Sequence, residues 1–566
     1  MTRAEHLTAA ARLEALPFTP ESVPQIAEHL SAAGIVDRAI NYFEAAGDIA
    51  VSGGDYAQAA AAYRRSIALE QARTRPRTEL VRKLARALLL GGCPDESALV
   101  LAHLVESSKA SGGPASDDFA TLGMAYWTDA QTATWLGPVV GAAEGAVDDA
   151  ERFENLTTIA GISYELGNIG RAKRFLKRAG EISANVPAGV RARYLDILGR
   201  TKISSGMVDE ALRDFREARE LAELHANDDL YFAIIGNNAD VMQLIGRIDE
   251  ALSLWKQLFL HAKSSCMGWH VPDTALNAAS CLRERGDLAE AVRFLTIGLS
   301  HESSCATLRI RAAAAGIPIG LLLEREDFIE RCADESVIEL TLRTKECARI
   351  GPTIAAFVEL FLARRRDDEA IALLDAGVQA LRRADHAYAL LALACEHGTA
   401  ETSARALAML NEAAHIRRDP LSRAFALYAQ GLAAHRKRDT GATRRLAAAA
   451  ASEFLSLTLP VRHARALELA GKMREALHVY EMIGDVRDAR RLSSLFARRK
   501  SRGSADAALT SRQTEIARLV AQGLTNKEIA DALEISEKTV ENHLQTIYAR
   551  LGLSSRARLI ANFISQ

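Results

Sequence analysis

Polar side chains recur along one side of the segment EKTVENHLQTIYARL, residues 537–551. Its apolar residues are spaced i, i+4, i+7 and i+11, which is typical of a helix with one buried face. These residues are Val540, Leu544, Ile547 and Leu551. The opposite face carries Lys538, Glu541, Asn542 and Gln545. A glutamate can accept a hydrogen bond from cytosine N4, and asparagine or glutamine can pair with adenine. The pattern therefore predicts a helix that presents base-reading groups.

Capping signals begin the helices around this segment. Thr510 with Gln513, and Thr525 with Glu528, have the spacing of a capping box. In that arrangement the two side chains satisfy free amides of a first helical turn. Ser536 stands where it can cap the helix at 537–551. These signals predict four short helices between residue 509 and the end of the chain.

The order of these helices matters for function. A helix over 526–533 is followed by a short turn at 534–536 and then by the helix at 537–551. This is a helix-turn-helix arrangement, in which the second helix of the motif lies in the major groove. That helix is the third of the four predicted here. A helix of this length spans roughly 22 Å, enough to present several side chains to base edges. We therefore expect residues 537–551 to read DNA.

The whole segment LTSRQTEIARLVAQGLTNKEIADALEISEKTVENHLQTIYARLGLSSRARLIANF, residues 509–563, resembles the LuxR/FixJ-type DNA-binding domain of bacterial transcription regulators. In that family the third helix enters the major groove, the second contacts phosphates, and the fourth forms the dimer contact on DNA. The resemblance implies double-stranded DNA and a second copy of the chain as partners.

The resemblance assigns roles to individual residues. Base edges are expected to be read by Glu541, Asn542 and Gln545. Phosphates are expected to meet Asn526, Lys527, Lys538 and Thr539. The dimer contact is expected at Leu559, Ile560 and Phe563. Many family members have a basic residue at the position of Glu541, so the DNA sequence that this chain reads need not be theirs.

The charge of the chain gives little support for DNA binding. Seven Lys and Arg against six Asp and Glu leave residues 509–563 with a net charge of +1, and the whole chain has −2. Most DNA-binding domains have a basic footprint. The basic residues crowd instead into residues 487–502. That stretch either follows the phosphate backbone or forms a solvated linker.

The remaining composition is typical of a water-soluble protein. Of the 566 residues, 49% are apolar and 25% are charged. The N-terminus lacks the uninterrupted apolar core of a signal peptide, and no run reaches the roughly 18 apolar residues of a membrane span. The seven cysteines form no closely spaced pair. We therefore expect a cytoplasmic protein without a membrane partner.

Residues 1–495 show a helical repeat. Gly167, Gly206, Gly246 and Gly286 stand 39, 40 and 40 residues apart. Five residues after each stands an alanine, and four further on a large apolar residue, as in Ala251 and Trp255. The pattern recurs after Gly34, Gly54, Gly92 and Gly471, and less cleanly around Arg365. A small residue lets neighbouring helices approach while a large one fills the groove beside it. The chain is therefore predicted to be all-α.

This repeat resembles tetratricopeptide repeats, helix pairs that stack into a right-handed superhelix with a concave binding face. Its spacing is longer than the 34 residues typical of that family. Residues 23–70 resemble the start of the helical region in large ATP-binding LuxR-type regulators. In those proteins a nucleotide-binding domain precedes the helical array, and the DNA-binding domain ends the chain. Here only the array and the terminal domain are recognised.

Nucleotide chemistry is not expected. A phosphate-binding loop needs GxxxxGK followed by Ser or Thr, whereas the single Gly-Lys pair, Gly471-Lys472, is followed by Met473. We expect no cofactor, no metal site and no enzymatic activity. An ATP-driven switch would require the nucleotide-binding domain to lie on another chain or upstream of this sequence.

Three regions are predicted: a tetratricopeptide-like array at 1–495 that receives a signal, a basic flexible linker at 496–504, and a LuxR-type domain at 505–566. The favoured function is a transcription regulator whose array binds a protein or small-molecule effector. The alternative is an interaction scaffold whose DNA-binding module is weak or vestigial. The near-neutral charge of the module and the size of the array favour that alternative.

Overall fold

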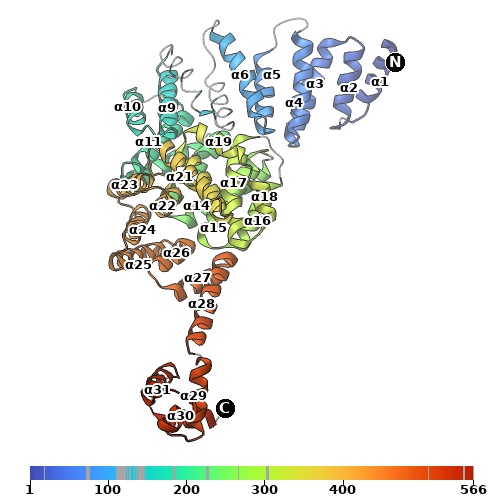
Figure 1. Cartoon of the computed structure of the whole chain (residues 1–566). Coiled ribbons are helices and arrows are strands. Elements are labelled where there is room, and N and C mark those ends of the chain that lie inside the picture. Colours follow the sequence, from blue (N-terminus) through green and yellow to red (C-terminus); the bar gives the residue numbers. More distant parts are fainter. Residues whose placement is uncertain are drawn as a thin grey trace. The chain divides into compact units, whose positions relative to one another are not determined.

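The computed structural model consists of helices joined by short turns, with no strand among the residues that it describes. These are all residues except 18, 72–76, most of 110–147, 183–185, 225–227, 266, 301–304, 508, 552, 554 and 565–566. They form two compact units, Met1–Val486 and Arg487–Gln566 (Figure 1). The prediction of an all-α protein is confirmed.

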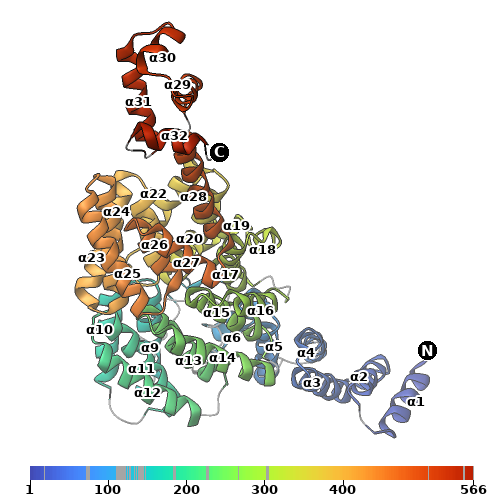
Figure 2. The ribbon, with the colours of Figure 1, turned by 90° about the horizontal axis from the view of Figure 1, so that it is seen from below.

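The first unit is an array in which consecutive helices pack side by side (Figure 1, Figure 2). It begins with α1 (Arg3–Glu14), α2 (Ser22–Ala32), α3 (Val36–Ser52), α4 (Tyr56–Gln71), α5 (Thr78–Leu90) and α6 (Pro94–Lys109). The middle helices are α9 (Asp149–Glu165), α10 (Ile169–Gly180), α11 (Ala188–Ile203), α12 (Val208–Leu224), α13 (Asp228–Leu244), α14 (Ile248–Ser264), α15 (His270–Arg285) and α16 (Leu288–Leu299).

The array continues through three further helices, α17 (Ala306–Leu323), α18 (Glu326–Cys332) and α19 (Ser336–Thr344). It ends with α20 (Cys347–Ala363), α21 (Asp367–Ala380), α22 (Tyr388–His397), α23 (Ala400–Arg417), α24 (Pro420–Arg436), α25 (Thr440–Ser456), α26 (Pro460–Leu469) and α27 (Met473–Ile483). Below, α9 to α16 are called the first wall and α20 to α27 the second wall.

The repeat glycines end helices in a left-handed conformation. Their φ angles lie between +74° and +84°, at Gly34, Gly54, Gly92, Gly167, Gly206, Gly246, Gly286 and Gly471. After α11, the amide of Gly206 donates to the carbonyl of Ile203, and that of Met207 to the carbonyl of Lys202, each at 3.0 Å. The last carbonyls of the helix are thereby satisfied. The glycines predicted to separate helices are confirmed as turn residues.

The small and large repeat positions both lie in the core. The alanine five residues after the glycine is 0% exposed in seven repeats, at Ala39, Ala59, Ala172, Ala211, Ala251, Ala291 and Ala476. The large residue four further on is at most 4% exposed, at Phe43, Tyr63, Leu176, Phe215, Trp255, Leu295 and Tyr480. Phe215 packs so closely on the preceding helix that a Cβ at Gly199 would lie 2.8 Å from its ring. Tight helix pairing therefore explains the repeat.

Two helix pairs of the second wall use arginine in place of glycine. Arg365, before α21, and Arg438, between α24 and α25, have φ angles of +59° and +60°. After Arg365 the small and large positions follow as before, since Ala370 and Leu374 are each 0% exposed. The pair α24 and α25 has no glycine at its turn, and a search that uses glycine as the marker does not find it.

The two walls meet where the glycine turns of the first wall reach the second. A Cβ at Gly206 would lie 2.2 Å from the carbonyl oxygen of Ile416, and one at Gly286 would lie 2.8 Å from Pro460. Gly246 similarly lies against Leu457. These glycines therefore serve close approach as well as the turn, and the interior of this part of the array is lined by both walls.

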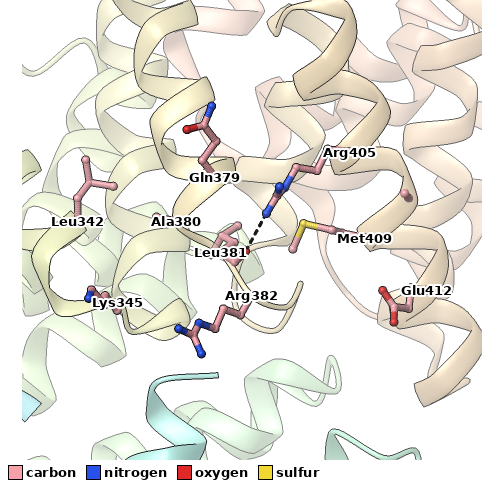
Figure 3. Close-up of a pocket in the computed structure, with 10 residues that line it drawn as sticks. Leu342, Lys345, Gln379, Ala380, Leu381, Arg382, Arg405, Met409 and Glu412 are labelled. Atoms are coloured by element: carbon pink, nitrogen blue, oxygen red, sulfur yellow. Dashed lines mark hydrogen bonds between the residues drawn. The ribbon is translucent and has the colours of Figure 1, made fainter. Parts of the chain in front are cut away.

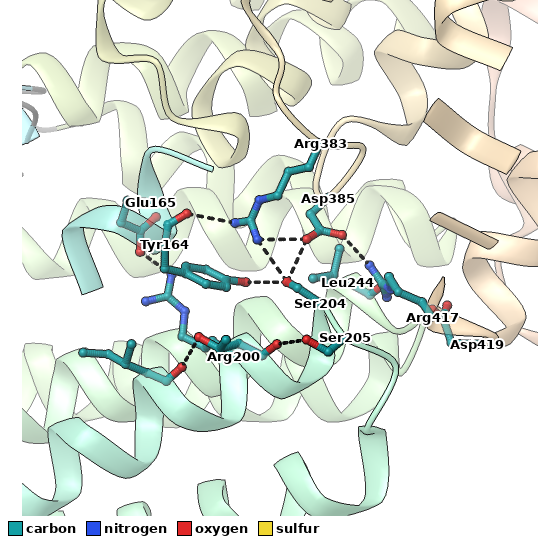
Figure 4. A network of polar contacts seen from close by, with 12 residues as sticks. Tyr164, Glu165, Arg200, Ser204, Ser205, Leu244, Arg383, Asp385, Arg417 and Asp419 are labelled. Atoms are coloured by element: carbon teal, nitrogen blue, oxygen red, sulfur yellow. Dashed lines mark hydrogen bonds and ion pairs between the residues drawn. The ribbon is translucent and has the colours of Figure 1, made fainter. Parts of the chain in front are cut away.

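A buried polar network also joins the walls (Figure 4). The hydroxyl of Ser204 donates to Asp385 at 2.9 Å and accepts from Arg383 at 3.0 Å. Arg417 pairs with Asp385 at 3.0 Å and donates to the backbone carbonyl of Leu244 at 2.8 Å. Asp385 therefore connects two guanidinium groups of the second wall to the ends of α11 and α13.

The second unit contains α28 (Val486–Ala507), α29 (Ser511–Ala521), α30 (Asn526–Ala532), α31 (Glu537–Leu551) and α32 (Arg556–Ile564). Residues 496–504, predicted as a flexible linker, lie inside α28. The predicted region boundaries at residues 495 and 505 stay predictions.

One described helix, α17, is long and apolar enough to cross a membrane by length and composition alone. Of its 18 residues, 72% are buried inside the array. Its apolar character is therefore explained by packing, because it lies between α15 and α20.

Candidate nucleic-acid interface

The helices α29 to α32 enclose one apolar core. Val540 and Ile547 of α31 are 0% exposed and Leu544 is 5% exposed, as predicted for the apolar stripe. The other helices contribute Ile516, Ala517, Val520, Ile529, Ala530 and Leu559. This core fixes which side of α31 faces outward.

Local capping begins each helix where the sequence predicts it. Thr510 with Gln513 and Thr525 with Glu528 form complete capping boxes. The hydroxyl oxygen of Ser536 accepts from the amide of Thr539 at 3.1 Å and so caps α31. In the second box, hydrogen bonds from the Thr525 amide and hydroxyl lower the pKa of Glu528. Side chains thus cap the start of both α30 and α31.

The residues predicted to read bases are all exposed on α31. At roughly 100° per residue, Asn542 lies within about 10° and Gln545 within about 50° of the direction opposite the buried stripe. Glu541 lies about 90° to one side, and its carboxylate pairs with the ammonium of Lys538 at 3.0 Å. Lys538 lies within about 30° of the same direction, so the outward face carries the two amides and this ammonium, with the carboxylate of Glu541 at its edge.

The residues predicted to contact phosphate divide into two groups. Lys527 and Lys538 are exposed, whereas Asn526 and Thr539 are half-buried. The side-chain oxygen of Asn526 accepts from Arg556 at 2.9 Å. The hydroxyl of Thr539 lies 2.7 Å from that of Ser536. Lys527 has no ion pair among the described residues, Lys538 is exposed but paired with Glu541, and the other two side chains are engaged in local structure.

The dimer contact stays a prediction, but one of its three residues does not lie at the surface. Leu559 is 0% exposed and belongs to the core of the unit itself, so its side chain does not reach a surface. Ile560 is half-buried beside that core. The side chain of Phe563 lies outside the described residues. The apolar periodicity of α32 serves its packing, which is why Leu559 lies in the core and away from the surface.

Three arginines hold the domain together in ways that the sequence did not reveal. Arg512 donates to the carbonyl of Leu533 at 2.7 Å, at the end of α30. Arg550 donates to the side-chain oxygen of Gln513 at 2.8 Å, and Arg556 donates to the carbonyl of Leu524. Each bond joins residues at least 21 positions apart, beyond the reach of any local pattern. These arginines fix α30 and α31 relative to α29 and α32.

The positive charge that is left for DNA is small. Arg518, Lys527 and Arg558 are exposed and have no ion pair among the residues that the structure describes. The other four basic residues of the domain make the contacts given above. Of the seven basic side chains, only three are therefore exposed without one of the contacts that the structure describes, and the net charge of the domain does not show this.

The array has its own candidate surface for an effector. An open groove of about 640 Å³ lies at α19, α21 and α23 (Figure 3). Lys345, Arg382 and Arg405 line it together with one acid, Glu412. Arg405 donates to the carbonyl of Leu381 at 3.4 Å. The lining is cationic, but its groups stand on an open surface.

The comparisons with known proteins concern mainly the last unit. Residues 507–563 match the family model described as bacterial regulatory proteins, luxR family. A Mycobacterium bovis protein named as an HTH-type transcriptional regulator is 48% identical over 52 residues, which are 9% of this chain and 6% of that protein. The Escherichia coli response regulatory protein YgeK is 50% identical over 60 residues, 11% of this chain and 41% of that protein. The chain thus spans less than half of these relatives.

Two solved structures resemble the chain more broadly. One is a structure of the APC/C hetero-tetramer Cut9-Hcn1, with 11% identity and a TM-score of 0.35 over 92% of this chain and 96% of that one. The other is a Rap protein complexed with competence and sporulation factor, with 12% identity and a TM-score of 0.35 over 67% of this chain and 99% of that one.

Proposed function

We propose that this chain, whose residues 507–563 form a LuxR-family helix-turn-helix domain, is a transcription regulator that reads a specific DNA sequence through α31. The array, in this proposal, receives a protein or small-molecule effector that controls the domain. A second copy of the chain binds the adjacent half-site.

One observation carries the reading role of α31. Asn542 and Gln545 are exposed opposite the buried stripe, with no described side chain covering them. Each amide can donate and accept at an adenine edge, and a good bidentate pair discriminates against a wrong base by about 1–3 kcal/mol. Lys538 and Lys527 stand on either side of the turn that leads into α31 and supply phosphate contacts.

The test is a DNA-binding measurement on the full chain. A site is first selected from random duplexes, and the Asn542→Ala and Gln545→Ala variants are then titrated against that site and against single-base variants of it. We expect each variant to bind the site about 10- to 100-fold more weakly and to lose preference at one base position. Gln522→Ala is the matched control, since Gln522 is exposed at the end of α29. Equal losses in all three variants would remove α31 as the reader.

Dimerisation is tested separately. Two half-sites placed about 10 base pairs apart should be bound cooperatively by a two-fold dimer. In the proposal α32 forms the contact through Ile560 and Phe563. Sedimentation of the complex on DNA with one or two half-sites gives the number of chains bound. One chain on the double site would exclude the dimer.

The second candidate function is an interaction scaffold with a weak DNA-binding module. The engagement of Arg512, Arg550 and Arg556 inside the domain favours it, because few basic groups remain for phosphate. Purely electrostatic binding weakens steeply with salt. Sequence preference that survives at about 0.15 M salt would exclude this candidate, and its loss would support it.

A further inference from the structure

Two cavities lie inside the array, the larger lined by residues of both walls and the smaller mainly by residues of the first wall. One has a volume of about 260 Å³ and the other of about 240 Å³. They share the side chains of Glu165, Arg200, Asn237, Asp240 and Arg311. Both are smaller than the roughly 300–1,000 Å³ of pockets for drug-sized ligands. Their size suits a small metabolite.

Asp240 of α13 has an unusual position at the junction of the cavities. Its carboxylate forms no hydrogen bond or ion pair with the residues that the structure describes, although it lines both cavities. The nearest cations are already paired, Arg200 with Glu165 and Arg311 with Asp273 at 2.7 Å. Buried charges in proteins are ordinarily paired. Asp240 is half-buried, and no cation among the described residues is in contact with its carboxylate.

A further carboxyl group adds negative charge near Asp240. Asp196 lies 3% exposed near Arg200, and one of its oxygens accepts from Asn237 at 2.8 Å. Glu165, Asp196, Asp240 and Asp273 thus surround Arg200 and Arg311, while Arg383 adds positive charge near Glu165 and Arg349 adds it near Asp273. Burial raises the pKa of Asp240 to about 6, against the opposing effect of Arg311 and Arg200, so the group is mostly ionised at pH 7.

Histidine does not supply the missing charge. His270 lines the smaller cavity and His386 the larger one. Burial lowers the pKa of His270 to about 3 and that of His386 to about 4, so both rings are neutral at pH 7. Residues 110–147, most of which the structure does not describe, contain no Lys, Arg or His. That segment has no cation to offer either.

The smaller cavity continues from Asp240 into apolar surroundings. Phe232, Trp255 and Leu258 line it together with Trp269. Aromatic faces attract organic cations and pack against their carbon atoms. The described residues contain no group of three or more His, Cys, Asp or Glu that could hold a metal ion. The lining therefore matches an organic cation better than an inorganic one.

We propose that the paired cavities are the binding site of a small organic amine, with its ammonium group on Asp240 and its carbon body against Phe232 and Trp255. The binding site itself does not depend on the proposed function. Only the role of the amine as the effector of the array rests on it. A ligand here is placed to act on the contact between the walls, since Arg200 lies 4.4 Å from the Tyr164 ring and Arg383 of the second wall lies 4.1 Å from the same ring (Figure 4).

The test measures binding of 2-phenylethylamine to the full chain by calorimetry at pH 7.5, with 2-phenylethanol as the neutral probe of similar shape. We expect saturable binding of the amine and at least about tenfold weaker binding of the alcohol, because a charge-assisted hydrogen bond is lost. 1,4-Diaminobutane and tetramethylammonium test whether the site prefers an aromatic body or a second charge. No binding by any of the three cations would overturn the proposal.

The Asp240→Asn variant should bind the amine at least about tenfold more weakly. Asp209→Asn is the matched control, since Asp209 is exposed in the first turn of α12. Thermal unfolding of both variants establishes that they fold. Unchanged amine binding in Asp240→Asn would overturn the site. DNA binding of the same variants is measured without amine, so a failure of the amine site is distinguished from a failure of the regulator function.

Discussion

Glu541 is the residue of α31 that departs from the resemblance, and its geometry gives it a definite role. Its carboxylate lies beside the outward face and holds Lys538 at 3.0 Å. A glutamate at a base edge accepts from cytosine N4, and the same charge repels phosphate. In the proposed function, Glu541 is therefore expected to add selectivity and to reduce general affinity.

The Glu541→Ala variant is expected to bind unrelated DNA more tightly and to lose about 1–3 kcal/mol of discrimination at one base position. Lys538, freed from its partner, then contacts phosphate. The measurement compares dissociation constants for the selected site and for unrelated duplexes across a series of salt concentrations. Glu515→Ala is the matched control, because Glu515 is as exposed as Glu541 and forms an i,i+3 pair with Arg512 away from α31. Equal behaviour of both variants would assign the effect to net charge alone.

Asp240 makes a prediction for stability that is independent of any ligand. Burial raises the pKa of Asp240 from 3.8 to about 6. Between these values the folded chain binds a proton that the unfolded chain has lost, so stability falls as pH rises through this window. Asp240→Asn removes that dependence. We expect the variant to match the parent near pH 4 and to exceed it by about 1–3 kcal/mol above pH 6.

Denaturant unfolding at a series of pH values measures this difference. Asp209→Asn should keep the pH dependence of the parent. If the parent and Asp240→Asn lose stability in parallel between pH 4 and 7, then Asp240 is not the group responsible. Asp196, whose pKa burial raises to about 7, would remain as the source.

At the residue scale the exposed polar face of α31 could be predicted from the sequence, whereas the contacts of other residues could not. Asn542 and Gln545 follow from the spacing of the apolar stripe, because helix periodicity is local. Leu559 was placed at the dimer contact although it lies in the core. A single apolar stripe on α32 has the same appearance in either role. Asn526 accepts a hydrogen bond from Arg556, 30 residues away. No local spacing in the sequence predicts this contact.

At the scale of single elements, the turn glycines combine two constraints that can be separated. Gly34 has a φ of +76° and open space around it, whereas Gly206 has a φ of +80° and lies against the carbonyl oxygen of Ile416. Gly34→Ala therefore introduces backbone strain alone, about 1 kcal/mol. Gly206→Ala introduces the same strain and a clash at the contact between the walls.

We expect Gly206→Ala to lower the free energy of unfolding by several kcal/mol and Gly34→Ala by about 1–2 kcal/mol. Denaturant unfolding of the full chain compares the two variants directly. Hydrogen exchange then shows where the loss falls, with protection reduced at the end of α23 only in Gly206→Ala. Equal losses in the two variants would mean that the walls do not depend on this approach.

The helix pairs could be predicted because their turns and packing repeat at fixed spacing. The glycines predict the turns. The alanine and the large apolar residue at fixed distances after them predict which face of each helix is buried. The pair α24 and α25 was missed because Arg438 adopts a positive φ of +60°. The surrounding structure stabilises such a turn, and the residue type at the turn does not predict it.

At the scale of the whole array, the return of the second wall onto the first had no signal in the sequence. The residues that join the walls lie far apart in the sequence. Ser204 and Asp385 are 181 residues apart, and Arg417 and Leu244 are 173 residues apart. Each is a single polar residue in a long helical region. The tetratricopeptide resemblance implies a concave face, and here helices of the same chain enclose that space.

Asp385 is the centre of this closure and makes the last prediction. Burial alone would raise its pKa, but the guanidinium groups of Arg383 and Arg417 outweigh burial and hold the pKa at about 2. A carboxyl group with a lowered pKa stabilises the fold above its unfolded value near 4, and this contribution is lost as pH falls toward 2. Asp385→Asn should therefore destabilise the array at pH 7 and have little effect near pH 2.

The expected loss at pH 7 is about 3–5 kcal/mol, because two buried arginines are left short of a partner. Denaturant unfolding of the full chain measures it. Glu339→Gln breaks an exposed pair with Arg343 and should cost less than about 1 kcal/mol. If Asp385→Asn were as mild as this control, the network would not hold the walls together. A large loss accompanied by weaker amine binding would instead tie the closure of the array to the cavities that Arg200 lines.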